Sequence, residues 1–338
     1  MISVAEKLIV FDRHFSVDDQ QLLFSGFIPR SAFPHPRPKL SLAFSTSQVN
    51  RSNRKMATTR DAPRGDFNPE PAFQYTLPPN KDWKVGQPFN EDGPSALAAE
   101  WAKGYEGGWQ TFETGKEKPA DIYRLMISGI IPRPIAFVSS LSASGTPNLA
   151  PFSYFSMVCH NPPLVSVSFT HGPTRHKDSS INIRETKQFT VNIISEPWVE
   201  GANWCSTDAP YETEEWVGSG LTKAESVSIS PRTFVKPARV KESAFSMECE
   251  LFSLQDISPP GSDTVTGTLV LGHVKAIHVR KDVWVNDGKG IGMVDPVKLR
   301  AISRMGGTTY GRVGEGFEIP RPVWNNIKED VAKIPKKE

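Results

Sequence analysis

Residues 131–158 read IPRPIAFVSSLSASGTPNLAPFSYFSMV. An apolar run ends in Ser139-Ser140, and the turn-forming residues Ser144-Gly145-Thr146-Pro147 separate it from a second run that begins at Asn148. Two short runs of strand-forming residues on either side of such a turn predict a β-hairpin. We therefore expect β structure to dominate this part of the chain.

The second half of the hairpin contains more polar and aromatic residues than a core strand requires. Ala150-Pro151 followed by Phe152-Ser153-Tyr154 brings small residues, accessible backbone and aromatic faces together. Ligand pockets combine apolar and aromatic walls with a few polar groups. The segment is therefore either a polar hairpin or one wall of a site for a flat heteroaromatic ligand.

Strand-like patterns continue on the C-terminal side of the hairpin. Residues 135–140, 164–170, 188–194, 244–251 and 265–279 alternate in polarity or are rich in β-branched side chains. In residues 244–251, every second side chain from Phe245 is apolar and the intervening ones, from Ser246, are polar, which predicts a half-buried antiparallel strand. Short strands without regularly interleaved helices favour a β-barrel or sandwich over a doubly wound nucleotide fold.

Two helices are expected before the hairpin. Gly93-Pro94 precedes SALAAEWAK and Gly104 follows it, which is the proline-first, glycine-last pattern of a short helix. A second helix is predicted from Pro119 to Ser128, with Gly129 as its stop. We place the folded domain at residues 94–321, followed by a polar C-terminal tail at 322–338.

Residues 1–93 form a disordered or extended N-terminal region by composition. Residues 20–60 contain no Asp or Glu and seven Arg or Lys among many Ser and Pro, which is typical of an organellar transit peptide or of disorder. Acidic residues in the first nineteen positions and four prolines favour disorder. Met56 is a plausible second start, so residues 1–55 would be an extension absent from the working protein. Residues 61–93 resemble an extended arm whose aromatic side chains, from Phe67 to Phe89, could contact a partner.

Charge and cysteine content restrict the partners. The 39 basic and 37 acidic residues leave a net charge of +2, so no global field favours nucleic acid or an anionic membrane surface. Three scattered cysteines form no disulfide framework and fit a reducing compartment, which makes the cytoplasm the expected location and an organelle the alternative. No apolar run approaches the ~18 to 20 residues of a membrane span.

Several familiar catalytic motifs are missing. The sequence GKGIG at residues 288–292 is followed by Asp295-Pro296, where a dinucleotide-binding helix would have to continue, so we expect a turn there. The minimal signatures of P-loop, serine hydrolase and zinc protease sites do not occur. His171 and His176 are separated by Gly172-Pro173, which gives no regular metal-ligand geometry, and no metal site is expected.

Two further polar stretches are candidate parts of a site. HGPTRHKDSSINIRET, residues 171–186, places Arg175 and Lys177 before a helix capped by Asp178 or Ser179. A helix N-terminus beside cations can bind an anion, although taken alone the stretch is better interpreted as an ordinary capped helix. RMGGTTY, residues 304–310, is a weaker pattern in which the paired glycines could simply form a turn.

Seven pieces in order resemble one known family. They are PRPIAFVSS, NLAPFSYF, NPPLVSVSF, KDSSINI, FTVNI, FSMECEL and RMGGTTY. The chain resembles the flavin reductase-like, FMN-binding split-barrel family over Tyr123 to Tyr310. The resemblance implies a mainly β Greek-key split barrel with a few peripheral helices, and a homodimer with FMN near the subunit interface.

The resemblance also implies which residues bind FMN. Those lining the flavin would be Ser139, Ser140, Asn148, Ala150, Pro151, Phe152, Ser153 and Tyr154. Lys177, Asp178 and Ser179 would hold the phosphate end, and Arg304 and Tyr310 would close the site. The family's usual threonine after Lys-Asp is Ser179 here, which keeps the hydroxyl group.

The expected function follows from the cofactor. Since the flavin itself carries hydride and electrons, no side chain needs to act as a general acid or base. We expect an oxidoreductase in which NADH or NADPH is the small-molecule electron donor and the electrons pass to an acceptor or a partner oxygenase. The alternative is a non-enzymatic FMN-binding carrier, sensor or interaction protein on the same barrel.

Overall fold

The computed structural model describes residues 63–70, 73–89, 95–211, 213–225 and 235–335. The chain divides into two units, Met1–Gly65 and Asp66–Glu338, and the elements described here belong to the second. The expectations for residues 1–55, for a start at Met56 and for the Gly93-Pro94 helix start lie outside the described residues.

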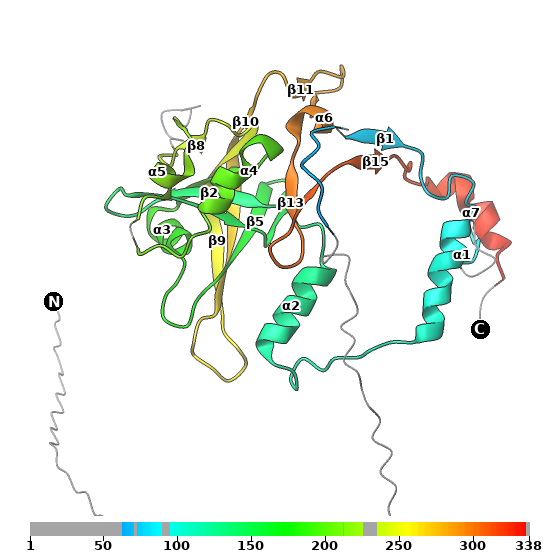
Figure 1. Ribbon diagram of the computed structural model, residues 1–338. Coiled ribbons are helices and arrows are strands. Elements are labelled where there is room, and N and C mark those ends of the chain that lie inside the picture. Colours follow the sequence, from blue (N-terminus) through cyan, green and yellow to red (C-terminus); the bar gives the residue numbers. More distant parts are fainter. Residues whose placement is uncertain (1–62, 71–72, 90–94, 212, 226–234, 336–338) are drawn as a thin grey trace, which may run out of the picture. The chain divides into compact units, whose positions relative to one another are not determined.

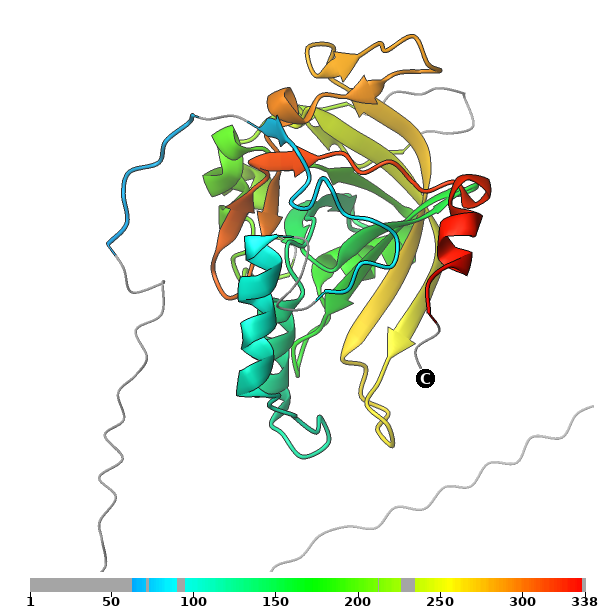
Figure 2. The same ribbon diagram turned by 90° about the vertical axis from the view of Figure 1, so that its right-hand side faces the viewer.

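A seven-stranded antiparallel sheet forms the body of the second unit (Figure 1). In spatial order the strands are β3 (Pro147–Phe152), β2 (Ala136–Leu141), β6 (Gln188–Asn192), β9 (Phe245–Ile257), β10 (Gly267–Val279), β5 (Pro163–Thr170) and β4 (Phe155–His160). Figure 2 shows how the two long strands β9 and β10 curve. The mainly β split-barrel prediction is confirmed, and all five predicted strands are present.

The split of the barrel has a simple origin in the chain. The edge strands β3 and β4 are consecutive in sequence and only Ser153 and Tyr154 separate them. The sheet is therefore closed at this point by a covalent bend rather than by a ladder of hydrogen bonds. The Tyr154 carbonyl oxygen still accepts from Ser168 N of β5 at 2.9 Å, so the bend stays attached to the β5 side of the sheet.

Two hydrophobic clusters hold the barrel together, and β2 contributes to both. Ala136 and Val138 pack into the barrel interior with Phe169, while Phe137 points the other way into a second cluster with Trp216. The second cluster lies between the sheet and a layer made by α4 (Val199–Trp204), α5 (Glu215–Ser219), β8 (Arg239–Val240) and β13 (Ile302–Arg304). Strand β2 is thus buried on both faces.

This second layer corrects one sequence expectation. Ser246 and Glu248 in β9 were expected to face solvent, but they are 0% and 1% exposed. Ser246 Oγ donates to Asn192 Oδ1 at 2.8 Å, and Glu248 Oε1 lies 2.7 Å from Nε2 of His278. The polar face of the strand is buried because polar partners on neighbouring strands satisfy it.

The predicted helices are present with small shifts. Helix α1 (Ala96–Lys103) is capped by Ser95, whose Oγ accepts from Ala98 N, and α2 (Pro119–Gly129) begins at its proline. Helix α3 (Asp178–Thr186) starts one residue before the predicted SSINIRET segment. Neither Asp178 nor Ser179 caps it; the N-cap residue is Lys177, which makes no side-chain capping bond. The prediction of a side-chain cap was wrong.

Smaller elements surround the barrel. They are η2 (Gly104–Gly107), η3 (Glu196–Trp198), α6 (Pro296–Leu299) and α7 (Trp324–Ala332), the last in the segment predicted as a polar tail. Short strand pairs are β1 (Gln74–Thr76) with β15 (Glu315–Phe317), β7 (Lys223–Ala224) with β8, β11 (Trp284–Val285) with β12 (Met293–Val294), and β13 with β14 (Tyr310–Arg312). Residues 288–292 form the turn before β12, as expected, with positive φ at three glycines.

Part of the N-terminal arm lies along the domain. The parallel pair of β1 with β15 is one contact, and the Arg312 guanidinium donates to the Asn68 carbonyl oxygen at 2.8 Å. Arg312 also stacks over the Phe67 ring at 5.0 Å. Among the described residues, no helix has both the length and the apolar character needed to cross a membrane.

Candidate functional site

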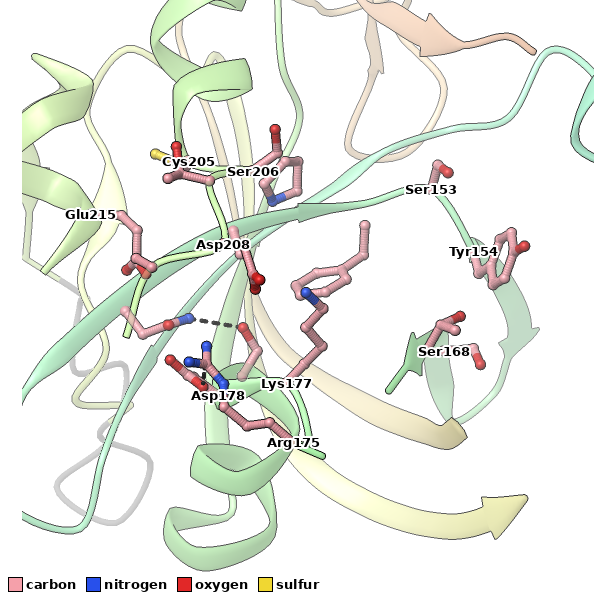
Figure 3. Close-up of a pocket in the computed structure, with 18 of the residues that line it drawn as sticks. Ser153, Tyr154, Ser168, Arg175, Lys177, Asp178, Cys205, Ser206, Asp208 and Glu215 are labelled. Atoms are coloured by element: carbon pink, nitrogen blue, oxygen red, sulfur yellow. Dashed lines mark hydrogen bonds and ion pairs between the residues drawn. The ribbon is translucent and has the colours of Figure 1, made fainter. Parts of the chain in front are cut away.

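A cavity of about 280 Å³ opens beside the split of the barrel (Figure 3). One wall consists of β3 and the Ser153–Tyr154 bend, and a second consists of Arg175, Lys177 and the first turn of α3. Tyr123 and Ile127 of α2 and Ser168 of β5 contribute further lining. The remaining wall is residues 205–209 together with Glu215.

Two separate stretches of predicted site residues meet in this cavity. Those that line it are Asn148, Ala150, Pro151, Phe152, Ser153, Tyr154, Lys177, Asp178 and Ser179. Asn148 Nδ2 donates to Ser179 Oγ at 2.8 Å and so ties β3 to the first turn of α3. The hydrogen bond makes the two walls a single unit.

Four predicted residues do not line the cavity. Ser139 and Ser140 are fully buried in β2, where Ser140 Oγ accepts from Asn182 Nδ2 of α3. The Arg304 guanidinium stacks over the Tyr310 ring at 4.5 Å, and Tyr310 OH donates to Asn203 Oδ1 at 2.8 Å. These residues support the walls from behind or form a neighbouring surface.

The α3 wall offers positive charge and backbone donors. Helix α3 has nine residues and no side-chain cap, and its Ser180 N–H already donates to the Lys177 carbonyl oxygen at 2.9 Å. The Ser179 N–H is the first-turn donor left for an external acceptor. Figure 3 shows Lys177 extending into the cavity from the start of this helix, with Arg175 beside Asp178. Backbone N–H groups, the helix dipole and cationic side chains are the features from which protein anion sites are built.

Asp178 lies in the same turn and is 8% exposed. Burial raises the pKa of its carboxyl group, and the neighbouring Arg175 opposes that rise. Arg175 Nη2 lies 3.3 Å from Asp178 Oδ1, but this oxygen has no hydrogen-bond donor. A buried acceptor facing a cavity fits the hydroxyl group of a ligand.

The wall made by residues 205–209 and Glu215 carries a buried carboxyl group and a buried thiol. Glu215 is 5% exposed, its Oε2 accepts from Leu149 N at 3.1 Å, and burial raises the pKa of its carboxyl group. Burial, with Glu215 nearby, raises the pKa of the Cys205 thiol to about 12. The thiol therefore stays protonated at neutral pH and is not a nucleophile.

Arg133 holds the bend from behind. Its Nη1 donates to the carbonyl oxygens of Ile127 and Ile130 at 2.6 and 2.7 Å, and its Nη2 donates to that of Met305 at 2.9 Å. Its Nε contacts Ser153 Oγ at 3.4 Å. The side chain is 7% exposed and fixes the end of α2 against the Ser153–Tyr154 bend.

Sequence reasoning missed several residues around the cavity. Cys205 and Glu215 come from a segment whose sequence has no pattern typical of a binding site. Arg133 is part of the PRPIAFVSS motif, but no role was predicted for it. Arg175 was noted as a cation but not assigned to the site. No group of three or more His, Cys, Asp or Glu side chains in the described part of the chain could hold a metal.

The polar groups that line the cavity are of the types that a flavin mononucleotide would require. The phosphate would meet Lys177, Arg175 and the α3 N–H groups, and the orphaned oxygen of Asp178 would meet a ribityl hydroxyl group. The flat ring would lie along Ala150–Tyr154.

Comparison with known proteins agrees with this geometry. Residues 128–289 match the flavin reductase like domain. An uncharacterized protein of Halalkalibacterium halodurans is 33% identical over 208 residues, covering 61% of this chain and 94% of that protein.

Two solved structures are similar over nearly their whole length. Nitrilotriacetate monooxygenase component B of Bacillus cereus is 32% identical with a TM-score of 0.58, covering 63% of this chain and 99% of that one. The 2-nitrobenzoate 2-nitroreductase of Pseudomonas fluorescens is 26% identical with a TM-score of 0.54, covering 64% and 98%. With its split barrel and the cavity at the split, the chain belongs to the flavin reductase-like family of flavoproteins.

Proposed function

We propose that the chain is an FMN-binding oxidoreductase that takes electrons from NADH or NADPH and delivers them to a small acceptor or a partner oxygenase. The observation that carries the proposal is the cavity itself. It joins an uncapped, cation-flanked helix N-terminus to a flat wall of small and aromatic residues at the barrel split.

The residues of the chain have distinct tasks in this proposal. Lys177, Arg175 and the first turn of α3 bind the phosphate, and Asn148 keeps Ser179 in place for it. The backbone at Ser153 and Tyr154 meets the polar edge of the ring. When bound, FMN supplies the chemistry, because it accepts a hydride and passes on electrons singly or in pairs.

Electrostatics then orient the ligand. Arg175 and Lys177 attract the phosphate to the start of α3, and Glu215 on the neighbouring wall would repel it once ionised. With the phosphate at α3, the ring end lies toward the bend that Arg133 supports, which Figure 3 shows at the other end of the cavity from Asp178. The chain contributes binding, orientation and positive potential rather than proton transfer.

The similar proteins favour a reductase over a passive carrier. One is a component of a monooxygenase and the other is a nitroreductase, and both are at least 25% identical to this chain. We infer from the first that a separate oxygenase is a candidate acceptor. A small oxidant bound by the protein itself is the corresponding inference from the second.

We also propose a homodimer. Met157 and Val158 of the edge strand β4 are 67% and 50% exposed, and on α2 Tyr123, Leu125 and Met126 are exposed although Ile127 is buried. An apolar edge strand beside an apolar helix face is a surface that soluble proteins usually cover. A second copy of the chain would cover it next to the cavity.

Anaerobic titration of the FMN-loaded protein with NADH and with NADPH tests the reaction. The visible absorption of the bound flavin should be lost with at least one of the two. If neither nucleotide bleaches a flavin that dithionite does bleach, the chain is a carrier and the proposed reaction is wrong.

A further inference from the structure

The loop between β5 and α3 contains a histidine whose two ring nitrogens are both engaged. His171 is 9% exposed, and its Nε2 lies 2.8 Å from Thr268 Oγ1 on β10. The backbone N–H of Lys177 points at its Nδ1, with 3.2 Å between the nitrogens. Lys177 is the N-cap residue of α3 and lines the cavity.

These contacts determine which nitrogen carries the proton. A backbone amide can only donate, so Nδ1 of His171 must present its lone pair to Lys177. The ring is therefore neutral, with hydrogen on Nε2, and it donates to Thr268 Oγ1. His171 is the acceptor that satisfies the N–H group of the N-cap residue.

The chain of hydrogen bonds continues beyond Thr268. Its hydroxyl group donates to Asp256 Oδ1 on β9 at 2.8 Å, and the same oxygen accepts from Arg184 Nη2 at 2.6 Å. Arg184 is in the last turn of α3. These hydrogen bonds thus attach both ends of α3 to the long strands of the barrel, the first end through His171 and the last through Asp256.

We propose that His171 is a positioning residue for the anion site. By accepting from Lys177 N–H it sets the backbone at the start of α3, and so aims the first-turn N–H groups and the Lys177 side chain into the cavity. This inference rests on the proposed binding of the FMN phosphate at α3. It concerns a residue outside the cavity lining, for which the sequence predicted only that it is not a metal ligand.

The surroundings of His171 keep the ring neutral. Burial lowers its pKa; His176, Lys177 and Arg184 lower it further, and Asp256 opposes them. The His176 ring stacks on it at a centroid distance of 4.1 Å and an angle of 3°. A protonated His171 would lose the lone pair that accepts from Lys177 N–H. The contribution of this contact is therefore complete above the ordinary pKa of histidine and is lost as the pH falls through the lowered pKa.

A matched pair of substitutions separates positioning from general stability. In His171→Asn the side-chain oxygen can take the place of Nδ1 and accept from Lys177 N–H, but it cannot titrate. In His171→Gln the longer amide reaches toward Thr268 instead and leaves Lys177 N–H without an acceptor. His176→Asn, which removes the stacked ring but not the hydrogen-bond chain, is the control.

We measure the dissociation constants of FMN and riboflavin for the full chain and the three variants at pH 7.5. For His171→Gln we expect FMN binding to weaken about fivefold to tenfold with riboflavin binding unchanged. His171→Asn and His176→Asn should stay within about twofold to threefold of the parent. Between pH 7.5 and 5.5, the parent should lose more FMN affinity than His171→Asn. The FMN phosphate titrates with either protein, whereas the side chain at position 171 titrates only in the parent.

The outcomes distinguish the two proposals. If the parent binds FMN no more tightly than riboflavin, the phosphate site is wrong and this inference fails with it. Suppose instead that the parent binds FMN more tightly than riboflavin, but that His171→Asn and His171→Gln weaken FMN binding equally or weaken the binding of both flavins in parallel. The phosphate site then stands and the positioning role is overturned. The imidazole ¹⁵N shifts of the parent protein add a test that needs no variant: we expect the Nε2–H form at pH 7.5, and an Nδ1–H or charged ring would contradict the proposal.

Discussion

The two sides of the cavity each contain a cationic side chain at a helix end, but the cations are used differently. At the bend, Arg133 is buried and its guanidinium donates to three carbonyl oxygens around the end of α2. At α3, Lys177 and Arg175 are exposed and face the cavity. A cation satisfied by carbonyl groups shapes a wall, whereas one that faces the cavity can bind a ligand.

The strongest effect on stability is expected from Arg133→Met. The carbonyl oxygens of Ile127, Ile130 and Met305 would lose a buried donor, so the free energy of unfolding should fall by about 3 kcal/mol or more. Chemical denaturation measures this change. Arg133→Lys keeps the charge on a single nitrogen and should recover only part of the loss. A methionine variant as stable as the parent would show that Arg133 is not structural.

Lys177→Ala should weaken FMN binding and leave the stability of the fold unchanged. FMN affinity should fall about tenfold, the lower end for a charge-assisted contact because the side chain is exposed, while riboflavin affinity and the melting temperature stay unchanged. The parent's advantage for FMN should shrink as salt is added. Lys281→Ala, at an exposed lysine outside the cavity lining, is the control. Unchanged, salt-insensitive FMN binding in Lys177→Ala would show that Lys177 does not bind the ligand and so does not differ from Arg133 in that respect.

Ser179→Ala should fall between these two extremes. Its hydroxyl accepts from Asn148 Nδ2 in a buried position, so the free energy of unfolding should drop by about 1 to 2 kcal/mol. FMN affinity should decrease less than in Lys177→Ala. Thermal melting and FMN titration measure the two effects, and Ser156→Ala at an exposed serine of β4 is the control. Loss of FMN affinity without loss of stability would mean that Ser179 contacts the ligand rather than the β3 wall.

The smallest effect is expected from Glu215→Gln. The amide oxygen can still accept from Leu149 N, and removal of the negative charge should strengthen FMN binding by about twofold to threefold at neutral pH. The raised pKa of Glu215 means that its ionisation opposes folding as the pH rises from the ordinary pKa of a glutamate through the folded value. The stability gained by the variant should therefore grow over that pH range. Equal melting temperatures at pH 4.5 and 7.5, relative to the parent, would contradict a buried carboxyl group.

The strands and helices were largely predictable because their signals are local. Alternation in residues 188–194 and 244–251 identifies β6 and β9, and a first-turn proline identifies α2. The burial of Ser246 and Glu248 was not predictable from the strand alone. It depends on partners on other strands, which no short window of sequence contains.

The cavity was predictable only in part. Its β3 and α3 walls carry recognisable polar motifs, and both line it. Glu215 was missed because a single glutamate in an acidic segment gives no sign of burial. Ser139, Ser140, Arg304 and Tyr310 were assigned by resemblance, and none of them lines the cavity in this chain. The side chains of Ser140, Arg304 and Tyr310 contact other residues.

The proposed function depends on α3 binding the phosphate group of a flavin. Titration of the purified protein with FMN and with riboflavin, followed by quenching of flavin fluorescence, measures this contact. Because the two ligands differ only in the phosphate, we expect at least tenfold tighter binding of FMN at low salt and a smaller difference at high salt. Equal affinities for the two flavins at every salt concentration would contradict it.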